Sequence, residues 1–333
     1  MALLEVQDLH VRLHTPRGWA VAVRGASLSL ERAQTLGLIG ESGCGKSLTA
    51  LALMGLLPAG AQVSGSIRFD GQELLGQSDR TLGRIRGSRI SMIFQEPMTA
   101  LNPVQRVGQQ VAEPLRLHRG ASAASARQQA IALLERVGIA NAAQRIDAYP
   151  HQFSGGQRQR IMIAMALACG PDLLIADEPT TALDVTIQKQ ILDLIAELTR
   201  ERGTALLLIS HDLGVIAQNV SRMLVMYGGA VIEGGPTASV FSQRRHPYTR
   251  GLFGARPSLQ RTPGQRLPTL AGTVPELVDL PPGCTFAGRC PHATPECHRL
   301  APPVVLLPTA HGSEHSVRCA RLDAIAAQAQ EPL

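Results

Sequence analysis

The sequence predicts an α/β protein with an antiparallel β subdomain, an inserted α-helical subdomain and a small C-terminal extension rich in cysteine and proline. Short, wholly apolar runs at residues 173–176 and 205–209 are typical of buried parallel strands, and residues 185–200 between them have a helical pattern. Alternating apolar and polar residues near the N-terminus are typical of half-buried antiparallel strands. Composition indicates the extension, because 13 of the 22 prolines and four of the six cysteines lie after residue 245.

The antiparallel subdomain is expected at the start of the chain. Residues 3–13, 20–30 and 65–70 alternate between apolar and polar side chains, so each segment buries one face and exposes the other. The pattern becomes helical at residues 107–137, where apolar residues recur at the spacing of one helix face. We therefore place the inserted helical subdomain at about residues 97–160.

The composition excludes several classes of protein. The formal net charge of +6 comes from scattered arginines, and aromatic residues make up only 3% of the chain, so no nucleic-acid partner is predicted. The chain contains no run of about 18 uncharged apolar residues, and we expect that it does not cross a membrane by itself. The first ten residues lack the pattern of a secretory signal, which predicts a cytosolic protein with reduced cysteines.

Residues 40–47, GESGCGKS, lie between a run typical of a strand and a run typical of a helix. They fit the pattern G-x-x-x-x-G-K-[ST] of loops that bind nucleotide phosphates. Glycines let backbone N–H groups converge on the phosphates, the lysine reaches the β- and γ-phosphates, and the last serine is a ligand of Mg²⁺. The sequence therefore predicts a nucleotide site that contains Gly40, Ser42, Gly43, Cys44, Gly45, Lys46 and Ser47.

Two carboxylates, Asp177 and Glu178, follow the apolar run at residues 173–176. A buried strand does not tolerate charge in its interior, so both side chains are expected at the carboxyl end of the sheet, where α/β proteins bind ligands. Alone, such a pair also fits the start of a helix. Because a phosphate loop is present, we assign Asp177 to Mg²⁺ and Glu178 to the polarisation of an attacking water.

Two further polar residues follow apolar runs. His211 comes after residues 205–209 and is expected to touch the γ-phosphate, although a single histidine is more often structural. Gln95 comes after residues 90–94 and is expected either to sense Mg²⁺ and the attacking water or to cap a strand. We predict a catalytic role for both residues.

A second segment has the features of an anion-binding helix terminus. Residues 153–160 read FSGGQRQR and run into an apolar helix. Ser154 suits the N-cap position, and Gly155 and Gly156 leave bare N–H groups at the start of the helix. A plain helix cap explains Ser154, but it does not explain a second phosphate-ready terminus in the same chain.

Taken together, these segments resemble the ATP-binding cassette of ABC transporters. The resemblance covers about residues 3–245 and implies an ABC-type P-loop ATPase that uses ATP and Mg²⁺. We therefore place the cassette at residues 1–245 and the extension at residues 246–333. One departure is Phe153, where leucine is more usual in the family. The matching segments occur in the family's order and are GESGCGKS, Gln95, FSGGQRQR, LLIADE, Ala182-Leu183-Asp184 and Ser210-His211-Asp212.

The resemblance also implies roles that the residues alone do not show. Two cassettes are expected to face each other head to tail, so that one chain closes on the ATP held by Lys46 of the other. The closing segment consists of Ser154, Gly155, Gly156 and Gln157. Asp184 is expected at the same nucleotide site.

Adenine in this family stacks on an aromatic ring that precedes the phosphate loop. Trp19 is the only tryptophan and lies 27 residues before Lys46, so we select it as the stacking residue. The alternative is a plain surface or strand aromatic.

Three further stretches resemble the oligopeptide and dipeptide importer branch, which includes nickel and opine systems. They are residues 95–103, QEPMTALNP, residues 246–249, HPYT, and the cysteine-bearing tail. The resemblance implies a translocase-class ATPase for peptide uptake, peripheral on the cytoplasmic face of the inner membrane. The implied partners are a second ABC ATPase subunit, expected to be a paralogue, two transmembrane permease subunits and an extracytoplasmic solute-binding protein. Open alternatives are nickel or another small solute, a non-transport cassette ATPase and an inactive regulatory module.

Four cysteines of the extension, Cys284, Cys290, Cys297 and Cys319, have the spacing C-x5-C-x6-C-x21-C. Disulfides are not expected in the cytosol, and the C-x2-C pairs typical of zinc sites are missing from this segment. Four thiolates suit a [4Fe–4S] cluster better than zinc, although the spacing matches neither ferredoxin pattern. Cysteines that bind no metal are the third alternative, and any metal group here is expected to be structural.

Overall fold

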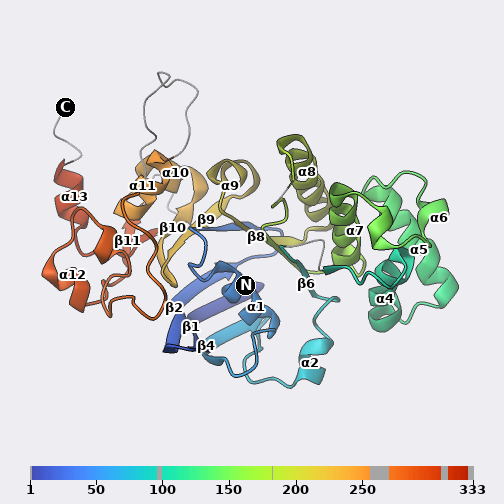
Figure 1. Cartoon of the computed structure of the whole chain (residues 1–333), viewed down its shortest axis with the longest axis horizontal. Coiled ribbons are helices and arrows are strands. Elements are labelled where there is room, and N and C mark those ends of the chain that lie inside the picture. Colours follow the sequence, from blue (N-terminus) through green and yellow to red (C-terminus); the bar gives the residue numbers. More distant parts are fainter. Residues whose placement is uncertain (1, 96–99, 182, 256–269, 309–313, 329–333) are drawn as a thin grey trace.

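The computed structural model describes residues 2–95, 100–181, 183–255, 270–308 and 314–328, except for the side chains of residues 326–328. A helical lobe lies at one end of the molecule and the C-terminal region at the other, with the two β-sheets between them (Figure 1). This arrangement agrees with the α/β fold and the two added parts that the sequence predicts.

The N-terminal part forms a four-stranded antiparallel sheet with the strand order β2-β1-β4-β5. Buried and exposed side chains largely alternate along β1, as expected for a strand with one face on the core. The sheet confirms the antiparallel subdomain predicted from the sequence. Its strands are β1 (Leu4–Thr15), β2 (Gly18–Leu30), β4 (Gln62–Phe69) and β5 (Gln72–Glu73).

The central sheet has eight strands in the order β11-β12-β10-β9-β3-β8-β7-β6. Five of them run parallel: β3 (Thr35–Ile39), β6 (Ile90–Ile93), β7 (Leu173–Asp177), β8 (Ala205–Ser210) and β9 (Arg222–Tyr227). Every residue of β7 and β8 is buried, as is typical of parallel strands that are covered on both faces. Because parallel strands end at one edge, the polar residues that follow β3, β6, β7 and β8 are brought together there.

The C-terminal region adds strands to the central sheet. β10 (Ala230–Pro236) pairs with β9, and β12 (Glu314–Val317) and β11 (Val305–Pro308) continue the sheet in antiparallel fashion. The sequence predicted a loop-rich region here and missed both strands, because pairing between segments as distant as β10 and β12 leaves no local pattern. The short helices of this region are α11 (Pro247–Gly254), η2 (Ala287–Arg289), α12 (Pro295–Arg299) and α13 (Leu322–Gln328).

The helical lobe follows β6 in the chain. Two of its helices, α4 (Val107–Arg119) and α5 (Ala123–Arg136), cover the stretch predicted to be helical. Gly120 separates them, because its φ of 63° ends α4 in a left-handed conformation. The lobe also contains α6 (Ala142–Arg145) and the 3-10 helix η1 (Pro150–Gln152).

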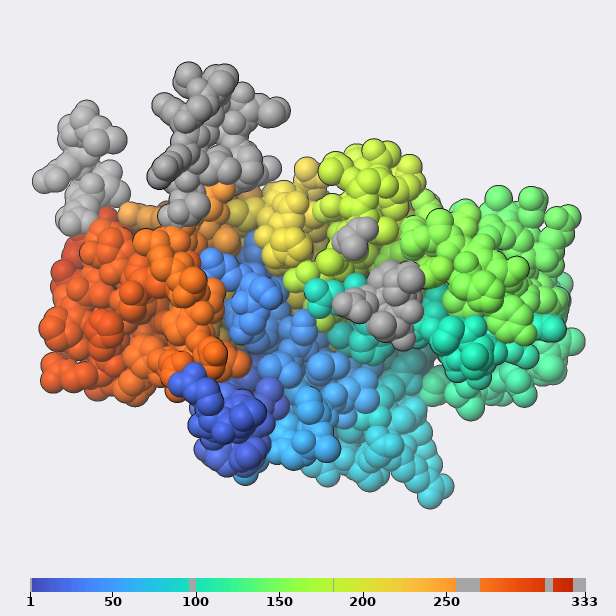
Figure 2. All heavy atoms as spheres, in the orientation of Figure 1, coloured from blue at the N-terminus to red at the C-terminus, as the bar shows by residue number. Residues whose placement is uncertain are grey.

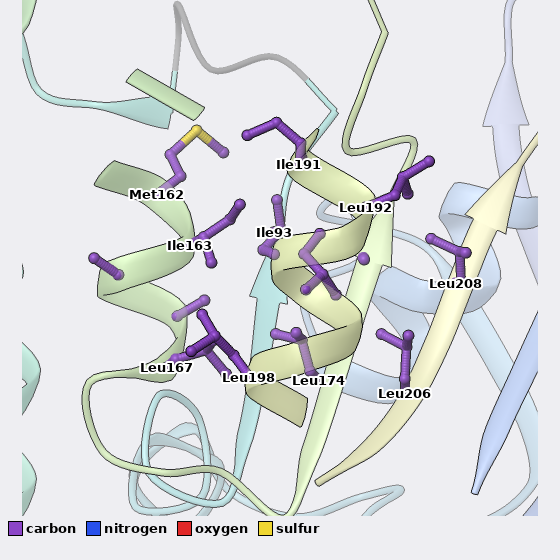
Figure 3. Close-up of a cluster of buried hydrophobic side chains, with 14 of the residues drawn as sticks. Ile93, Met162, Ile163, Leu167, Leu174, Ile191, Leu192, Leu198, Leu206 and Leu208 are labelled. Atoms are coloured by element: carbon purple, nitrogen blue, oxygen red, sulfur yellow. The ribbon is translucent and has the colours of Figure 1, made fainter. Parts of the chain in front are cut away.

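Two helices anchor the lobe to the central sheet. α7 (Gly155–Leu167) and α8 (Val185–Arg202) pack side by side over β7, and α8 confirms the helix predicted at residues 185–200 (Figure 3). Ile163 of α7, Ile191 of α8 and Leu174 of β7 have no exposed surface. Full burial of one such side chain stabilises the fold by ~1.5–3 kcal/mol. The remaining helices are α1 (Lys46–Met54), α2 (Asp79–Gly83), α9 (Leu213–Asn219) and α10 (Thr237–Gln243).

The C-terminal region packs against the antiparallel sheet, where its orange surface adjoins the blue surface of the N-terminal strands in Figure 2. Arg17, in the turn before β2, forms ion pairs with Glu276 at 2.7 Å and Asp279 at 2.6 Å. Nearby, Nη1 of Arg24 donates a hydrogen bond to the carbonyl oxygen of Pro281 at 3.1 Å. These contacts join the first and last parts of the sequence.

Across the described residues, we find no helix with both the length and the apolar character that a membrane span requires.

Candidate nucleotide site

The loop between β3 and α1 forms a cradle of backbone groups. Gly43 and Gly45 adopt φ angles of 78° and 100°, a region that strains residues with a side chain. A Cβ atom at Gly40 would lie 2.1 Å from the carbonyl oxygen of Met226, so only glycine permits this close approach. Gly45 caps α1 without a side-chain hydrogen bond, which leaves the first N–H groups of α1 available to an anion.

Lys46 is the first residue of α1, and its side chain turns back over the loop. Its Nζ donates hydrogen bonds to the carbonyl oxygens of Gly40 at 2.8 Å and Glu41 at 3.1 Å. The residue is only 5% exposed, and Nζ lies 4.0 Å from Oε1 of Glu178. The ammonium group is therefore held between the loop carbonyls and the carboxylate that follows β7.

Asp177 ends β7 and is almost fully buried. Its Oδ1 has no hydrogen-bond partner among the described residues, and the side chain of Ser47 interacts with the same carboxylate. Burial raises the pKa of Asp177, because loss of hydration disfavours the charged carboxylate, and this outweighs the opposing effects of Ser47 and Lys46. Since Mg²⁺ prefers carboxylate and hydroxyl oxygens, Asp177 and Ser47 fit a magnesium site.

Glu178 follows in a left-handed backbone conformation, with a φ of 45°. Its Oε2 lies 3.3 Å from Nε2 of Gln95, 3.0 Å from Oγ1 of Thr181 and 3.1 Å from Nδ1 of His211. The structure therefore brings together the three residues that the sequence singled out for catalysis. The sequence missed Thr181, because a threonine three residues after a strand end carries no distinctive pattern.

A pocket of about 250 Å³ opens beside Glu178. Most of its lining is polar, which suits a charged and hydrated group better than an apolar ligand. The lining residues are Glu178, Thr180, Thr181, Leu183, Gln188, Ser210, His211 and Asp212.

The chain is similar to known proteins. Residues 23–181 match the ABC transporter family, and residues 232–297 match the family described as Oligopeptide/dipeptide transporter, C-terminal region. The oligopeptide transport ATP-binding protein OppD of Salmonella typhimurium is 51% identical over 302 residues, which cover 91% of this chain and 90% of that protein. The chain belongs to the ABC transporter family. As a member of this family, it is an ATPase that uses ATP and Mg²⁺.

Two further similarities support the assignment to ABC transporters. The dipeptide transport ATP-binding protein DppD of Bacillus subtilis is 49% identical over 319 residues, covering 95% of this chain and 94% of that protein. A solved dimeric structure of the ATP-binding cassette MJ0796, bound to ADP and Pi, has a TM-score of 0.63 and 26% identity. That match covers 70% of this chain and 98% of the solved chain.

The helix terminus at Ser154 also has the predicted local structure. Oγ of Ser154 accepts a hydrogen bond from the backbone N–H of Gln157 at 3.3 Å, and the Gln157 side chain accepts from the Ser154 N–H at 3.2 Å. A Cβ atom at Gly155 would have no neighbour within 4 Å, whereas one at Gly156 would lie 3.1 Å from Ile187. In the part of the chain that the structure describes, no hydrogen bond or ion pair joins residues 154–157 to residues 40–47.

Asp184 caps α8, where its Oδ1 accepts a hydrogen bond from the backbone N–H of Ile187 at 2.9 Å. A role at the nucleotide remains a prediction for this residue. Ala182, in the same triplet, lies outside the described residues, as do residues 96–99 of the stretch 95–103.

Trp19 lies in β2 and is 40% exposed. The guanidinium carbon of Arg12 lies 5.2 Å from the centre of the indole, and the ring of His14 packs edge-on at a centroid distance of 5.4 Å. Adenine stacking therefore stays a prediction, and an adenine would share the ring with these two neighbours.

The four tail cysteines gather around one small cavity, where each lines the wall. None of them is in a disulfide. Backbone N–H groups of Phe286, His292 and Arg321 interact with three of the sulfurs, and each is two residues after its cysteine. Burial raises the pKa of Cys284 to about 11, with a further contribution from the other three thiols. Within the described ranges, no group of three or more His, Cys, Asp or Glu residues is arranged to hold a metal ion.

Proposed function

We propose that the chain is the ATP-hydrolysing subunit of an importer that drives uptake of di- and oligopeptides across the cytoplasmic membrane. The observation that carries the cargo is about 50% identity to two relatives named for oligopeptide and dipeptide transport, over 91% and 95% of the chain. The match of residues 232–297 to the C-terminal region of such transporters supports the same cargo. Nickel or another small solute is the second candidate, because cargo is selected mainly by the other subunits.

Glu178 is the general base of ATP hydrolysis in this proposal. Its carboxylate takes a proton from a water molecule while the water oxygen attacks the γ-phosphorus, and the bond to the bridging oxygen breaks to give ADP and phosphate. The convergence of Gln95, Thr181 and His211 on Oε2 supports this role, because it fixes the carboxylate beside the pocket. The side chain of His211 is 63% exposed, so it is free to turn from Glu178 towards the γ-phosphate.

The phosphates are bound by Lys46 and by the N–H groups of residues 40–47. Ser47, Asp177 and Gln95 would hold Mg²⁺, which neutralises phosphate charge when bound. The buried Oδ1 of Asp177 supports this assignment, since it has no hydrogen-bond partner among the described residues and is left available to a cation. The residues proposed to bind the phosphates and Mg²⁺ therefore come from the phosphate loop, from the end of β7 and from the position after β6.

A second cassette, expected to be a paralogue, completes the site with its own residues 154–157. Support comes from the exposure of Ser154 and Gly155, which leaves this helix terminus open to a partner. The solved cassette MJ0796, which is described as dimeric with ADP and Pi, has a similar fold. In this chain, residues 1–245 form the cassette, with its helical subdomain at about residues 97–160, and residues 246–333 form the extension.

The importer also requires two transmembrane permease subunits and an extracytoplasmic solute-binding protein. The chain itself is peripheral on the cytoplasmic face of the inner membrane. Its relatives named for peptide transport support this assembly.

The tail cysteines bind a structural [4Fe–4S] cluster in this proposal. Support comes from four thiols around one cavity and from N–H groups aimed at three of the sulfurs, a type of contact that tunes such clusters. A cluster is wider than a single ion, so its ligands do not converge on one point as zinc ligands do. When bound, the cluster would fix the extension, in which few of the described apolar residues are buried.

Uptake of labelled peptides tests the proposed cargo. Cells that lack the chain are complemented with the wild type or with Glu178→Gln, and uptake of labelled dipeptides, tripeptides and longer peptides is compared with uptake of nickel. We expect only the wild type to restore peptide uptake. Restored nickel uptake with no change for any peptide would overturn the peptide cargo and leave the ATPase assignment intact.

A further inference from the structure

Glu41, the second residue of the phosphate loop, makes polar contacts both within the loop and with the C-terminal region. Its carbonyl oxygen accepts the hydrogen bond from Nζ of Lys46. Its backbone N–H donates to the phenol oxygen of Tyr248 at 2.9 Å, and its carboxylate pairs with the guanidinium group of Arg289 at 2.7 Å. The contacts from Tyr248 and Arg289 therefore come from the C-terminal region, more than 200 residues away along the chain.

The guanidinium group of Arg289 donates hydrogen bonds to three different residues. Its side chain is 6% exposed and Glu41 is 27% exposed, so this ion pair is much better shielded than a surface pair. Nη1 also donates to the phenol oxygen of Tyr227 at 3.3 Å, and Nε donates to the carbonyl oxygen of Ala271 at 2.9 Å. An arginine with its donors engaged in this way has one orientation, and it fixes the carboxylate that it binds.

A cluster of three aromatic rings packs the C-terminal region against β9, next to the phosphate loop. The rings of Tyr227, Tyr248 and Phe286 have centroid separations of 4.6, 5.1 and 5.5 Å, and all three residues are at most 1% exposed. Oγ1 of Thr285 donates to the carbonyl oxygen of Tyr227 at 3.1 Å. The aromatic cluster therefore joins the C-terminal region to the end of β9, which lies against Gly40 of the loop.

The HPYT stretch explains how Tyr248 is aimed at the loop. The backbone N–H of His246 donates to buried Glu233, and Nδ1 of His246 accepts from the N–H of Tyr248. Pro247 occupies the first position of α11, where its fixed φ suits a helix start. These contacts set the start of α11, and the ring of Tyr248 extends from there to Glu41.

We infer that Arg289 and Tyr248 are positioning residues of the nucleotide site, which act through Glu41 on Lys46 and the phosphate loop. Lys46 uses the carbonyl oxygens of Gly40 and Glu41 as its support, so rotation of the Glu41 peptide removes one acceptor and turns a loop N–H group away from the phosphates. Through these contacts the C-terminal region acts as a structural part of the nucleotide site. The inference rests on the phosphate-binding role proposed for Lys46.

The test compares two arginines that join the same parts of the chain. Arg289→Met breaks the contact to the loop, whereas Arg17→Met breaks the exposed ion pairs to Glu276 and Asp279, which do not involve the loop. Both full-length variants are assayed for binding of a fluorescent ATP analogue and, in the reconstituted transporter, for kcat and KM of ATP hydrolysis. We expect Arg289→Met to raise the Kd and KM about tenfold, and Arg17→Met to change them less than about twofold.

A double-substitution cycle tests whether Arg289 acts through Glu41. If it does, Glu41→Gln combined with Arg289→Met binds nucleotide no more weakly than Arg289→Met alone. Arg289→Lys keeps a positive charge and should restore part of the affinity. Additive losses in the cycle, or equal losses in the Arg289→Met and Arg17→Met variants, would overturn the inference.

Tyr248→Phe covers the case in which Arg289→Met fails to fold. This substitution keeps the packed ring and removes only the oxygen that accepts from Glu41, so we expect about a threefold rise in Kd with little change in Tm. Lys46→Ala is assayed beside it. Unchanged affinity in Lys46→Ala would overturn the phosphate-loop assignment, whereas weak binding by Lys46→Ala with normal binding by Tyr248→Phe and Arg289→Met would overturn only the inference.

Discussion

Nδ1 of His211 lies 3.1 Å from Oε2 of Glu178, the same oxygen that Gln95 and Thr181 approach. Glu178 and His211 follow the neighbouring parallel strands β7 and β8, and Gln95 follows β6. Their meeting point is a direct result of sheet topology, because β6, β7 and β8 are adjacent and end at one edge. This carboxylate oxygen is therefore the natural place to begin testing the catalytic assignment.

Glu178→Gln should keep ATP binding while it abolishes turnover. Glutamine preserves the size of the side chain but cannot take a proton from water, so steady-state hydrolysis by the transporter is expected to fall by at least about 100-fold. The variant should also accumulate as a closed dimer with ATP. Phosphate release and size-exclusion chromatography measure the two effects, and hydrolysis near the wild-type rate would show that another group is the base.

Asp177→Asn should stabilise the chain without nucleotide and remove its response to Mg²⁺. Burial raises the pKa of Asp177 in the folded state, so its contribution to stability is present at low pH and is lost as pH rises through that pKa. At neutral pH the charged form therefore costs stability, and a neutral isostere is expected to raise Tm by about 1–3 °C. The rise in Tm caused by Mg²⁺ and ATP should disappear.

Asp193→Asn is the control for this experiment, because Asp193 is exposed and pairs with Lys189 on the surface of α8. It should change neither Tm nor the response to Mg²⁺. A normal Mg²⁺ response in Asp177→Asn would contradict the assignment of this residue as a metal ligand.

His246→Asn should weaken the pH dependence of stability. Burial lowers the pKa of His246 from 6.5 to about 4, and Nδ1 accepts from the N–H of Tyr248 at 3.0 Å. The unfolded chain therefore binds a proton that the folded chain does not bind between pH 6.5 and about 4, so stability falls as pH falls through this window. Asparagine also accepts the N-cap hydrogen bond but does not titrate.

Denaturant unfolding at several pH values measures this effect. The slope of unfolding free energy against pH should be smaller in His246→Asn than in the wild type, by up to ~1.4 kcal/mol per pH unit. His298→Asn, at an exposed position in the same region, should keep the wild-type slope. Equal slopes in all three proteins would contradict the shifted pKa.

Cys284→Ser should remove the proposed cluster. Wild-type chain purified without oxygen is expected to contain about four iron atoms and to have the broad visible absorbance of a [4Fe–4S] cluster. Cys169→Ala is the matched control, since Cys169 is a buried core residue that does not line the cysteine cavity. Zinc without iron in the wild type would favour the zinc site. The absence of both metals would favour the third alternative, in which the cysteines bind no metal.

Local patterns predicted the phosphate loop and the buried strands from the sequence, and the resemblance of the combined motifs to a known family then predicted the cassette. The glycines at positions 40, 43 and 45 are needed for close approach or positive φ, and that requirement is visible one residue at a time. Apolar runs predicted β7 and β8, since full burial on two faces leaves almost no polar position in either strand. The same logic predicted Asp177 and Glu178 at a strand end.

Tertiary structure decided which distant residues share a site. Thr181 joins Glu178 only because the backbone turns left-handed after β7, and the four tail cysteines share one cavity only because strands β11 and β12 fold back beside β10. Arg289 likewise contacts Glu41 although 248 residues separate the two along the chain. The sequence by itself predicted which residues are proposed to bind phosphate, because backbone geometry and burial leave local patterns. It did not determine what supports them, because a contact between distant segments depends on how the sheet is assembled.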